Sequence, residues 1–417
     1  MIHIEKKENC CGCGACSQKC PQHCIRLIED KEGFLYPHIN KDACIDCGVC
    51  EKVCPVINPN EEKEPIETLA AQNKNEYLRM KSSSGGIFIS LAEYILQQKG
   101  AVVGAVFDKE WAVEHRIATN WRDIQRMMGS KYVQSRTGNT FSETEKLLKS
   151  GQQVLYTGSP CQIAALKRFL QKEYDNLFTV DFICHGVPSP AVWRDYLKEL
   201  NGYNDVWAAM GKKSKVSSLC DVRLITNIEF RNKSLLGWEK FCLIIKKHDF
   251  KKSNGTNKQN VIIADKHHNN LYMKAFIDNL ILRPSCYVCA AKSQKSGSDL
   301  TLADFWSVEK VLPQWHNDDK GTSILFVNTP KGSEALKAIE SSILIYNVSY
   351  SSIKPFNPAI TKSVCPHVNR ASFFKGYTNG KNSVHQLLIK NCFLPKDRIK
   401  LLAKLILKRF KPYHSQA

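Results

Sequence analysis

Apolar runs separated by amphipathic stretches fill the middle of the chain and predict alternating strands and helices. The runs at 101–107, 153–156 and 178–183 are short and apolar, as buried strands are. A helical stretch follows each of the last two runs. Strands that alternate with helices favour an α/β layer in the body of the protein.

The pattern changes on both sides of this body. Residues 25–28 and 34–39 predict a small hairpin, and the polar, acidic stretch at 55–68 predicts a linker. Residues 398–411 place apolar side chains on one helical face and lysines on another, which predicts a basic amphipathic helix. We therefore expect a small domain, a linker, a central α/β domain and a C-terminal extension, at 1–58, 59–68, 69–360 and 361–417.

Composition and charge narrow the class of protein. With 417 residues, 43% hydrophobic and 24% charged, the chain is globular and long enough for two or three domains. Its net charge of +19 is spread along the chain without a recognised nucleic-acid-binding motif, so we expect no nucleic-acid partner. The N-terminus has no signal-peptide pattern, and we expect a cytoplasmic protein whose thiols serve metal or redox chemistry rather than disulfides.

The cysteines are concentrated near the N-terminus. Eight of them form two runs with the spacing C-x-x-C-x-x-C-x-x-x-C-P, typical of bacterial two-cluster ferredoxins, in which the last cysteine of each run binds the other cluster. Zinc sites use two pairs of ligands and do not show this spacing. The predicted 4Fe-4S ligands are Cys10, Cys13, Cys16 and Cys54 for the first cluster, and Cys44, Cys47, Cys50 and Cys20 for the second.

Other cysteines carry weaker signals. Cys11 and Cys24 lie outside the ligand pattern and are expected to be buried and inert. Cys161 and Cys184 lie at two strand-to-helix junctions, where α/β proteins bind ligands, but position alone leaves inert thiols equally open. The C-x-x-C at 286–289 is compatible with half a zinc site, a dithiol or half a cluster site.

A serine- and glycine-rich loop precedes a predicted helix over 87–98. Ser83, Ser84, Gly85 and Gly86 would offer backbone N–H groups to an anion such as a phosphate, although most such stretches are ordinary helix caps. The segment 129–135 brings a lysine, Lys131, beside an aromatic ring, and in isolation it is typical of a surface loop.

The order of these motifs resembles the coenzyme F420 hydrogenase/dehydrogenase beta-subunit family. The doubled cysteine run is followed by SSSGGIF, GSKYVQS, GSPCQIAAL, CHGVPSP, FRNK…GW, LRPSCYVC and DLTLADFW. The likeness extends over residues 1–310 and is weakest between 203 and 262. One departure is Ser307, where the family pattern leads us to expect glycine after the tryptophan.

The resemblance implies an iron–sulfur flavoprotein with a small ferredoxin domain, a larger mixed α/β flavin-binding domain and a helical, basic C-terminus. It implies a third 4Fe-4S cluster and FAD in the central domain, and a proton-donating role for His185. The third cluster would take Cys161, Cys184, Cys286 and Cys289. The residues implied at the FAD are Ser83, Ser84, Gly85, Gly86, Lys131, Thr157, Gly158 and Ser159.

The function expected from this resemblance is electron transfer coupled to an organic substrate. A ferredoxin or another acidic carrier would reduce the clusters, and electrons would pass through FAD to an organic acceptor, either a deazaflavin coenzyme or a conjugated substrate. The basic body suits an acidic donor through charge steering. The alternative is an electron-transfer subunit of a larger redox complex, without a substrate of its own. No nickel ligands of a hydrogenase large subunit are recognisable.

The basic helix at 398–411 leaves two interpretations open. It could lie on an anionic membrane surface, which would place the protein at the inner face of the membrane, or pack on the core as a terminal helix.

Overall fold

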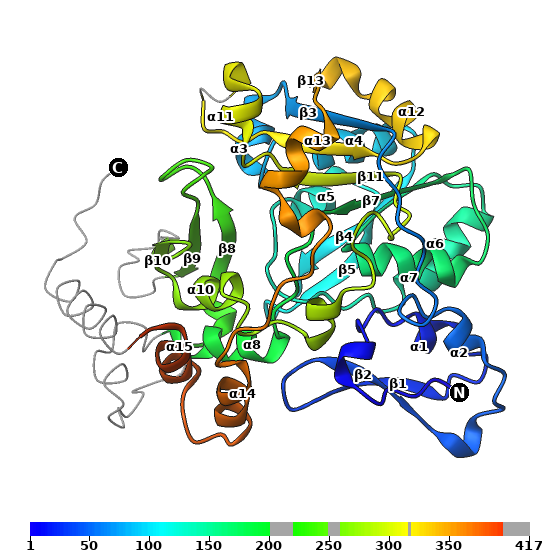
Figure 1. Cartoon of the computed structure of the whole chain (residues 1–417), viewed down its shortest axis with the longest axis vertical. Coiled ribbons are helices and arrows are strands. Elements are labelled where there is room, and N and C mark those ends of the chain that lie inside the picture. The colour runs from blue at the N-terminus through cyan, green and yellow to red at the C-terminus, as the bar shows by residue number, and fades with distance from the viewer. Residues whose placement is uncertain (201–219, 249–258, 316–317, 395–417) are drawn as a thin grey trace, which may run out of the picture.

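The computed structural model describes residues 1–200, 220–248, 259–315 and 318–394. A small N-terminal domain lies against a large mixed sheet that carries helices on both faces, and a three-stranded antiparallel sheet stands beside them (Figure 1). This arrangement confirms the predicted mixed α/β architecture with a small separate N-terminal domain.

The N-terminal domain repeats one local structure twice. In each cysteine run a glycine with left-handed φ, Gly14 at 78° and Gly48 at 69°, precedes a short helix that carries the third cysteine of the run. Because residues with side chains adopt this conformation at a cost, glycine lets the chain turn sharply there. Between the runs lies the predicted antiparallel hairpin. The elements are η1 (Lys7–Asn9), α1 (Ala15–Lys19), β1 (Ile25–Glu29), β2 (Leu35–Ile39), η2 (Lys41–Ala43) and α2 (Val49–Lys52).

The large sheet has eight strands in the order β13-β3-β12-β11-β7-β6-β4-β5. Pairing is parallel in the centre, from β4 through β6 and β7 to β11, and antiparallel towards both edges. The strands are β3 (Glu67–Asn73), β4 (Ala101–Phe107), β5 (Val113–Ala118), β6 (Val154–Thr157), β7 (Leu177–Phe182), β11 (Leu300–Asp304), β12 (Ser323–Val327) and β13 (Ile343–Asn347).

Helices bury both faces of this sheet, which explains why its central strands are apolar throughout. Neighbouring strand residues point to opposite faces: Val102 packs with α4, α5 and α12, whereas Val103 packs with α6 and α7. Helix α3 follows β3, and α11 and α13 lie near β12. The helices are α3 (Glu76–Lys81), α4 (Ile87–Gln97), α5 (Trp121–Met127), α6 (Thr140–Lys149), α7 (Pro160–Leu170), α11 (Val308–Val311), α12 (Pro330–Ala338) and α13 (Tyr350–Ile353).

The second sheet has the order β10-β9-β8 and shares an aromatic-rich core with four helices. Trp193 is at its centre, with rings of Tyr196, Phe230 and Tyr272 around it. Strands β8 and β9 form an antiparallel hairpin whose connection spans residues 233–241. The elements are β8 (Ile225–Asn232), β9 (Cys242–His248), β10 (Gln259–Lys266), α8 (Pro190–Lys198), α10 (Leu271–Ile277), α14 (Arg370–Thr378) and α15 (Val384–Cys392).

The N-terminal hairpin fits closely against the start of α8. Gly33, in the hairpin turn, has a φ of 88°, and a Cβ atom there would lie 2.3 Å from the Ala191 Cβ. The Ser189 hydroxyl donates a hydrogen bond to the Glu32 carbonyl oxygen at 2.5 Å, and Arg370 forms an ion pair with the Glu32 carboxylate at 2.6 Å. The small domain is therefore held directly on the body.

The predicted basic helix at 398–411 lies outside the described residues, and its contact with a membrane stays a prediction. Within the described ranges, no helix combines the length and the apolar character that a membrane span requires. Further helical turns in these ranges are η4 (Val222–Leu224), η6 (Pro284–Val288), η7 (Pro313–Trp315), η8 (Glu340–Ser342), η9 (Lys354–Phe356) and η10 (Pro358–Ile360).

Candidate metal centres and cofactor site

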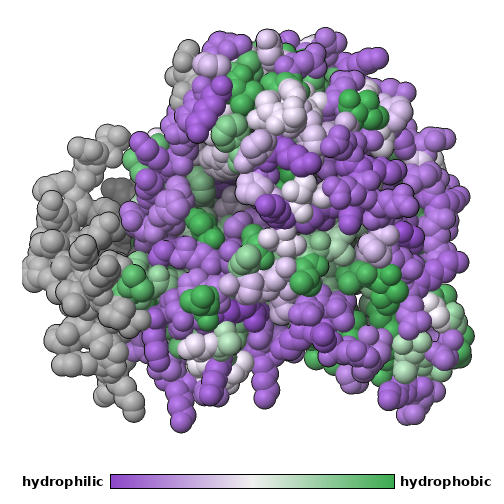
Figure 2. Space-filling model, viewed as in Figure 1, coloured by the Kyte–Doolittle hydropathy of each residue, from purple (hydrophilic) through white to green (hydrophobic). Residues whose placement is uncertain are grey.

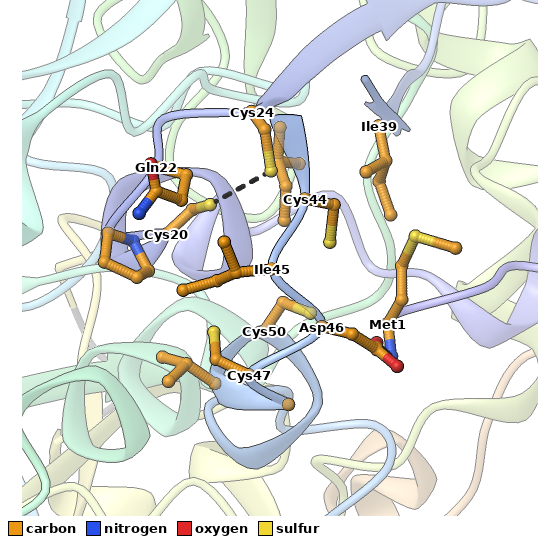
Figure 3. A pocket seen from close by; sticks show the side chains of 14 residues that line it. Met1, Cys20, Gln22, Cys24, Ile39, Cys44, Ile45, Asp46, Cys47 and Cys50 are labelled. Atoms are coloured by element: carbon orange, nitrogen blue, oxygen red, sulfur yellow. Dashed lines mark hydrogen bonds and ion pairs between the residues drawn. The ribbon is translucent and has the colours of Figure 1, made fainter. Parts of the chain in front are cut away.

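The second ferredoxin-type set of cysteines surrounds a cavity at the surface of the N-terminal domain. Cys44, Cys47 and Cys50 come from the second run, and Cys20 reaches the same cavity from the end of α1 (Figure 3). This is the crossed arrangement that the spacing predicts, with the last cysteine of the first run joining the second set. Cys47 is exposed, so this set opens towards solvent.

The first set is deeper. Burial raises the pKa of the Cys16 thiol to about 12, and the neighbouring Cys10 and Cys54 add to the rise. Four thiols close together disfavour one another's ionisation, whereas coordination to iron removes their protons outright. The donor set and its mutual proximity therefore fit a 4Fe-4S cluster, which takes four cysteine thiolates.

A third set of cysteines comes together from three distant segments. Cys161 lies in the first turn of α7, Cys184 follows β7, and Cys286 and Cys289 lie at the turn η6. All four line one cavity beneath the body. Burial raises the pKa of Cys286 to about 12, and Cys161 and Cys289 contribute to the rise. Four thiols on one cavity match the ligand number of one further cluster.

The local fold explains why Cys161 faces this cavity. Ser159 caps α7 through a reciprocal pair of contacts with Gln162, and Pro160 occupies the first helical position. The Ser159 hydroxyl lies 3.3 Å from the Cys161 sulfur. The helix start is thus fixed, and it holds the thiol at the cavity.

Cys11 links this cavity to the N-terminal domain. It is buried, lines the cavity of the third set, and its thiol lies within hydrogen-bonding reach of both Cys13 and Cys161. It is buried as the sequence predicts, but it is not remote from the other thiols. The only sequence signal for this position was its place between Cys10 and Cys13.

His185 lines the same cavity, beside Cys184. Its ring packs edge-on against Phe276 at 5.1 Å, and burial lowers its pKa. A buried imidazole of this kind is mainly neutral near pH 7.

The serine–glycine loop is tied into the large sheet. The Ser83 hydroxyl accepts hydrogen bonds from the Ser130 backbone N–H at 2.7 Å and from its hydroxyl at 2.8 Å. Ser84 donates to the Thr322 carbonyl oxygen, and the Gly85 N–H donates to the Ser323 hydroxyl. Gly86 has a φ of 83° and caps α4. The loop therefore approaches the segment that contains Lys131, but the Gly85 N–H already has a partner.

Lys131 turns towards its own backbone. Its ammonium group donates to the carbonyl oxygens of Met127, Met128 and Gly129, at 3.0–3.2 Å, where α5 ends. Burial lowers its pKa to about 7. In this structure the side chain therefore caps a helix, a use that the sequence pattern did not reveal.

The junction after β6 is also internally bonded. The Thr157 hydroxyl donates to the Val103 carbonyl oxygen at 2.9 Å, and the Gly158 N–H donates to the Val180 carbonyl oxygen at 3.1 Å. The Ser159 N–H donates to the Gln162 side chain at 2.9 Å. These hydrogen bonds fix the backbone conformation of the junction, which leads into Cys161 of the third set.

His115 provides a pH-dependent contribution to stability at this junction. Its Nε2 donates to the Thr157 carbonyl oxygen at 3.1 Å, and burial lowers its pKa from 6.5 to about 4. As pH falls below 6.5, the unfolded chain binds a proton that the folded protein does not, so stability decreases towards pH 4, by on the order of 3 kcal/mol. A His115→Gln protein should lack this component.

The measurement is the difference in free energy of unfolding between the two proteins, under anaerobic conditions, from neutral to acid pH. Acid loss of iron affects both proteins alike, so it cancels in the difference. A difference that does not change with pH would contradict a neutral, buried His115.

Two cations that sequence reasoning did not single out lie beside the serine–glycine loop. Lys233 is buried and donates to the carbonyl oxygens of Ser84 at 3.0 Å and Arg79 at 2.7 Å, and burial lowers its pKa to about 7. Arg231 is buried and pairs with Asp304, while its Nε has no acceptor within the part of the chain that the structure describes. Both belong to the FRNK motif. The position of this motif in the family's order of motifs is the sequence signal that could have identified them as candidate site residues.

Aromatic rings border this cationic pair. The Arg231 guanidinium lies 5.1 Å from the ring centre of Trp306, which stacks on Trp238 at 4.8 Å with an angle of 7° between the ring planes. Trp238 is buried, whereas Trp306 is 44% exposed. The region thus combines cations, hydroxyl groups and a partly exposed aromatic face.

Two crossed cysteine sets on a small hairpin domain, seated on an α/β body, define an iron–sulfur electron-transfer protein. Comparison with known families agrees. A 4Fe-4S dicluster domain matches residues 9–58, and the N-terminal and C-terminal parts of the coenzyme F420 hydrogenase/dehydrogenase beta subunit match residues 68–141 and 151–351. The chain belongs to this beta-subunit family, which confirms the resemblance of its motifs.

Among solved structures, the chain is similar to a chain of the F420-reducing NiFe hydrogenase complex from Methanosarcina barkeri. The two are 17% identical, the match covers 84% of this chain and 93% of that chain, and the TM-score is 0.42. A search of curated proteins finds no match.

Proposed function

We propose that this iron–sulfur protein is a flavin-dependent oxidoreductase that takes electrons from a ferredoxin-type donor and delivers them, through 4Fe-4S clusters and FAD, to an organic acceptor. The observation that carries the proposal is the convergence of Cys161, Cys184, Cys286 and Cys289 on one cavity next to the ferredoxin-type domain. A cluster at this position would carry electrons from the ferredoxin-type domain into the α/β body, where FAD and an organic acceptor would bind.

The route from the surface to this cavity is continuous. The second set opens to solvent at Cys47, three of the four cysteines of the first set are buried, and Cys11 reaches from the first set to Cys161 of the third. We propose that electrons enter at the second cluster, pass through the first and reach the third.

The donor would dock over the exposed side of the second set. Ile45 beside Cys47 is 61% exposed, and Figure 2 shows several small apolar groups over the N-terminal domain. Apolar side chains at an exposed redox centre favour a short-lived protein contact. The positive charge of the remaining chain would attract an acidic carrier from a distance.

FAD would lie beside the serine–glycine loop and the FRNK residues, which contact each other directly through Lys233 and Ser84. Arg231 has an unsatisfied N–H, which suits a phosphate oxygen or an electron-rich ring. The Lys233 ammonium already donates to three backbone carbonyl oxygens, so it would add positive charge without a free donor. Lys131 and the segment 157–159 are the other predicted contacts, and they would have to exchange their present backbone bonds for it. FAD, when bound, would supply the conversion between single electrons and electron pairs.

Residues of the chain would shape the acceptor site. The exposed face of Trp306 offers a surface on which a conjugated ring could stack. Arg231, whose charge is paired with Asp304, would offer its unsatisfied N–H to an acceptor atom of that ring. His185 is neutral at its buried position and could accept or donate a proton at the cavity of the third cysteine set.

The alternative is an electron-transfer subunit without a substrate of its own. The family's description as a beta subunit favours this alternative, because a subunit works within a larger complex. Flavin and iron content after strictly anaerobic purification separates the two functions. One FAD with about twelve irons per chain would support the proposal. About eight irons and no flavin would overturn it in favour of the electron-transfer subunit.

A further inference from the structure

Arg283 is a buried cation at the boundary between the N-terminal domain and the body. Its side chain is fully buried, and its Nε donates to the Cys10 carbonyl oxygen at 2.8 Å. Nη2 donates to the Leu35 carbonyl oxygen at 2.8 Å and approaches the Cys10 sulfur at 3.6 Å, while Nη1 donates to Gln134 Oε1 at 3.1 Å. The guanidinium group thus contacts both the backbone and the sulfur of Cys10, one ligand of the first cysteine set.

The charge of Arg283 has no carboxylate partner among these contacts. The oxygen atoms that accept its hydrogen bonds are neutral carbonyl and amide oxygens. Among the described residues, the two other buried arginines, Arg79 and Arg231, each pair with an aspartate. Because a buried charge without a counter-charge is costly, the position of Arg283 calls for negative charge that none of these contacts supplies.

The surroundings of Arg283 indicate where this negative charge lies. The side chain contacts Cys10 of the first set and also lines the cavity of the third set. Its guanidinium lies 4.4 Å from the ring centre of Tyr36, which shields it on the hairpin side. An iron–sulfur cluster with four thiolate ligands is an anion, and hydrogen bonds to its sulfurs together with nearby charge set its potential.

We propose that Arg283 is the counter-charge of the first cluster and raises its reduction potential, so that this cluster accepts electrons from the second and holds them beside the third cavity. The inference rests on the proposed function, because it requires a cluster on the first cysteine set. Reduction adds one electron from the protein donor to the cluster, and Arg283 stays protonated throughout. No proton or leaving group moves in this step.

A pair of variants separates charge from packing. Arg283→Met and Arg283→Lys both lose the forked hydrogen bonds, but only the methionine loses the charge. We expect the reduction equilibrium of one cluster to be about tenfold less favourable in the methionine protein than in the wild type. This corresponds to a midpoint potential about 59 mV lower for that cluster. The lysine protein should retain most of the wild-type value. The measurement is an EPR-monitored redox titration of the purified full chain.

Arg370→Met is the matched control. Arg370 also joins the two parts of the protein, through Glu32 and the Leu282 carbonyl oxygen, but its charge is paired with a carboxylate. Its replacement should leave all cluster potentials unchanged. If Arg283→Met retains its iron and shows the potentials of the Arg370 variant, the inference is wrong while the proposed function stands.

A measurement on the unmutated protein covers the case in which Arg283→Met does not fold. The chain is labelled with ¹⁵N at arginine only, and the reduced clusters are examined by pulsed EPR for coupling to this nitrogen. Coupling to a guanidinium nitrogen at one cluster is the expected result, and its absence at every reduced cluster would overturn the inference. A wild-type protein without iron on the first set would overturn the inference and the proposed function together.

Discussion

Replacing Cys286 with alanine is expected to lower the iron content from about twelve towards about eight atoms per chain, because a 4Fe-4S cluster that loses one of four thiolate ligands is held less firmly. Cys286 lies at the centre of the third set: its thiol accepts a hydrogen bond from the Val187 N–H at 3.4 Å and is close to Cys161 and Cys289. The two clusters of the N-terminal domain have separate ligands and should remain. Iron analysis and the intensity of the EPR signals measure the effect.

Cys242→Ala is the control for this experiment. Cys242 is more deeply buried than the cysteines of the third set, but it lies in β9 and belongs to none of the three sets. Its replacement should leave the iron content unchanged. If the Cys286→Ala protein keeps both the iron content and the EPR signals of the wild type, Cys286 is not a cluster ligand and the prediction is wrong.

Replacing Asp304 with alanine is expected to lower the free energy of unfolding by about 3–5 kcal/mol, since it leaves the buried Arg231 without its counter-charge. Asp304 also accepts a hydrogen bond from the Trp238 indole N–H at 3.1 Å, so its loss leaves a second buried donor unpaired. Chemical unfolding followed by tryptophan fluorescence, under anaerobic conditions, measures the change.

Two further variants test the cause of this loss. A double variant, Asp304→Leu with Arg231→Met, removes both charges and should recover a large part of the stability, because no buried charge is then left unpaired. Glu114→Ala breaks an exposed pair with Arg116 and should cost no more than about 1 kcal/mol. If Asp304→Ala is no more harmful than Glu114→Ala, the burial of the Arg231 charge is not the dominant effect.

The sequence predicts elements well where one local signal decides them. The apolar run at 101–107 coincides with β4, and the helix expected at 87–98 is α4 to within one residue. Strand β3 was missed, because Glu67 and Thr68 continue the polar linker and hide the start of the strand. Its antiparallel neighbours β12 and β13 lie far away in the chain, and hydrophobic periodicity carries no information on strand order.

The same distinction applies to the candidate sites. Spacing alone predicts the two ferredoxin-type sets, because the ligands of each run are neighbours in the chain, and the match to a 4Fe-4S dicluster domain confirms such a domain. The third set depends on contacts between distant segments, so only the family resemblance could suggest it, and its cluster stays a prediction. Buried cations such as Arg231 and Arg283 cannot be recognised from spacing, since burial of a charge is a property of the fold.

The orientation of Lys131 shows the same limit on a smaller scale. The sequence shows a lysine beside an aromatic ring, but not that helix α5 ends within reach of its ammonium group. Three backbone carbonyl groups at the end of this helix accept hydrogen bonds from the Lys131 ammonium group, and together they fix the orientation of its side chain.

The close fit at Gly33 has a consequence for the exchange of domains between redox proteins. A single added methyl group at Gly33 would overlap Ala191 at the start of α8, so only a hairpin turn with glycine at this position fits against the body. A ferredoxin module grafted from another protein would carry its own clusters, yet it would have to present a glycine in the same left-handed turn to seat. Recombination at the linker therefore selects for the shape of one turn as well as for the cluster ligands.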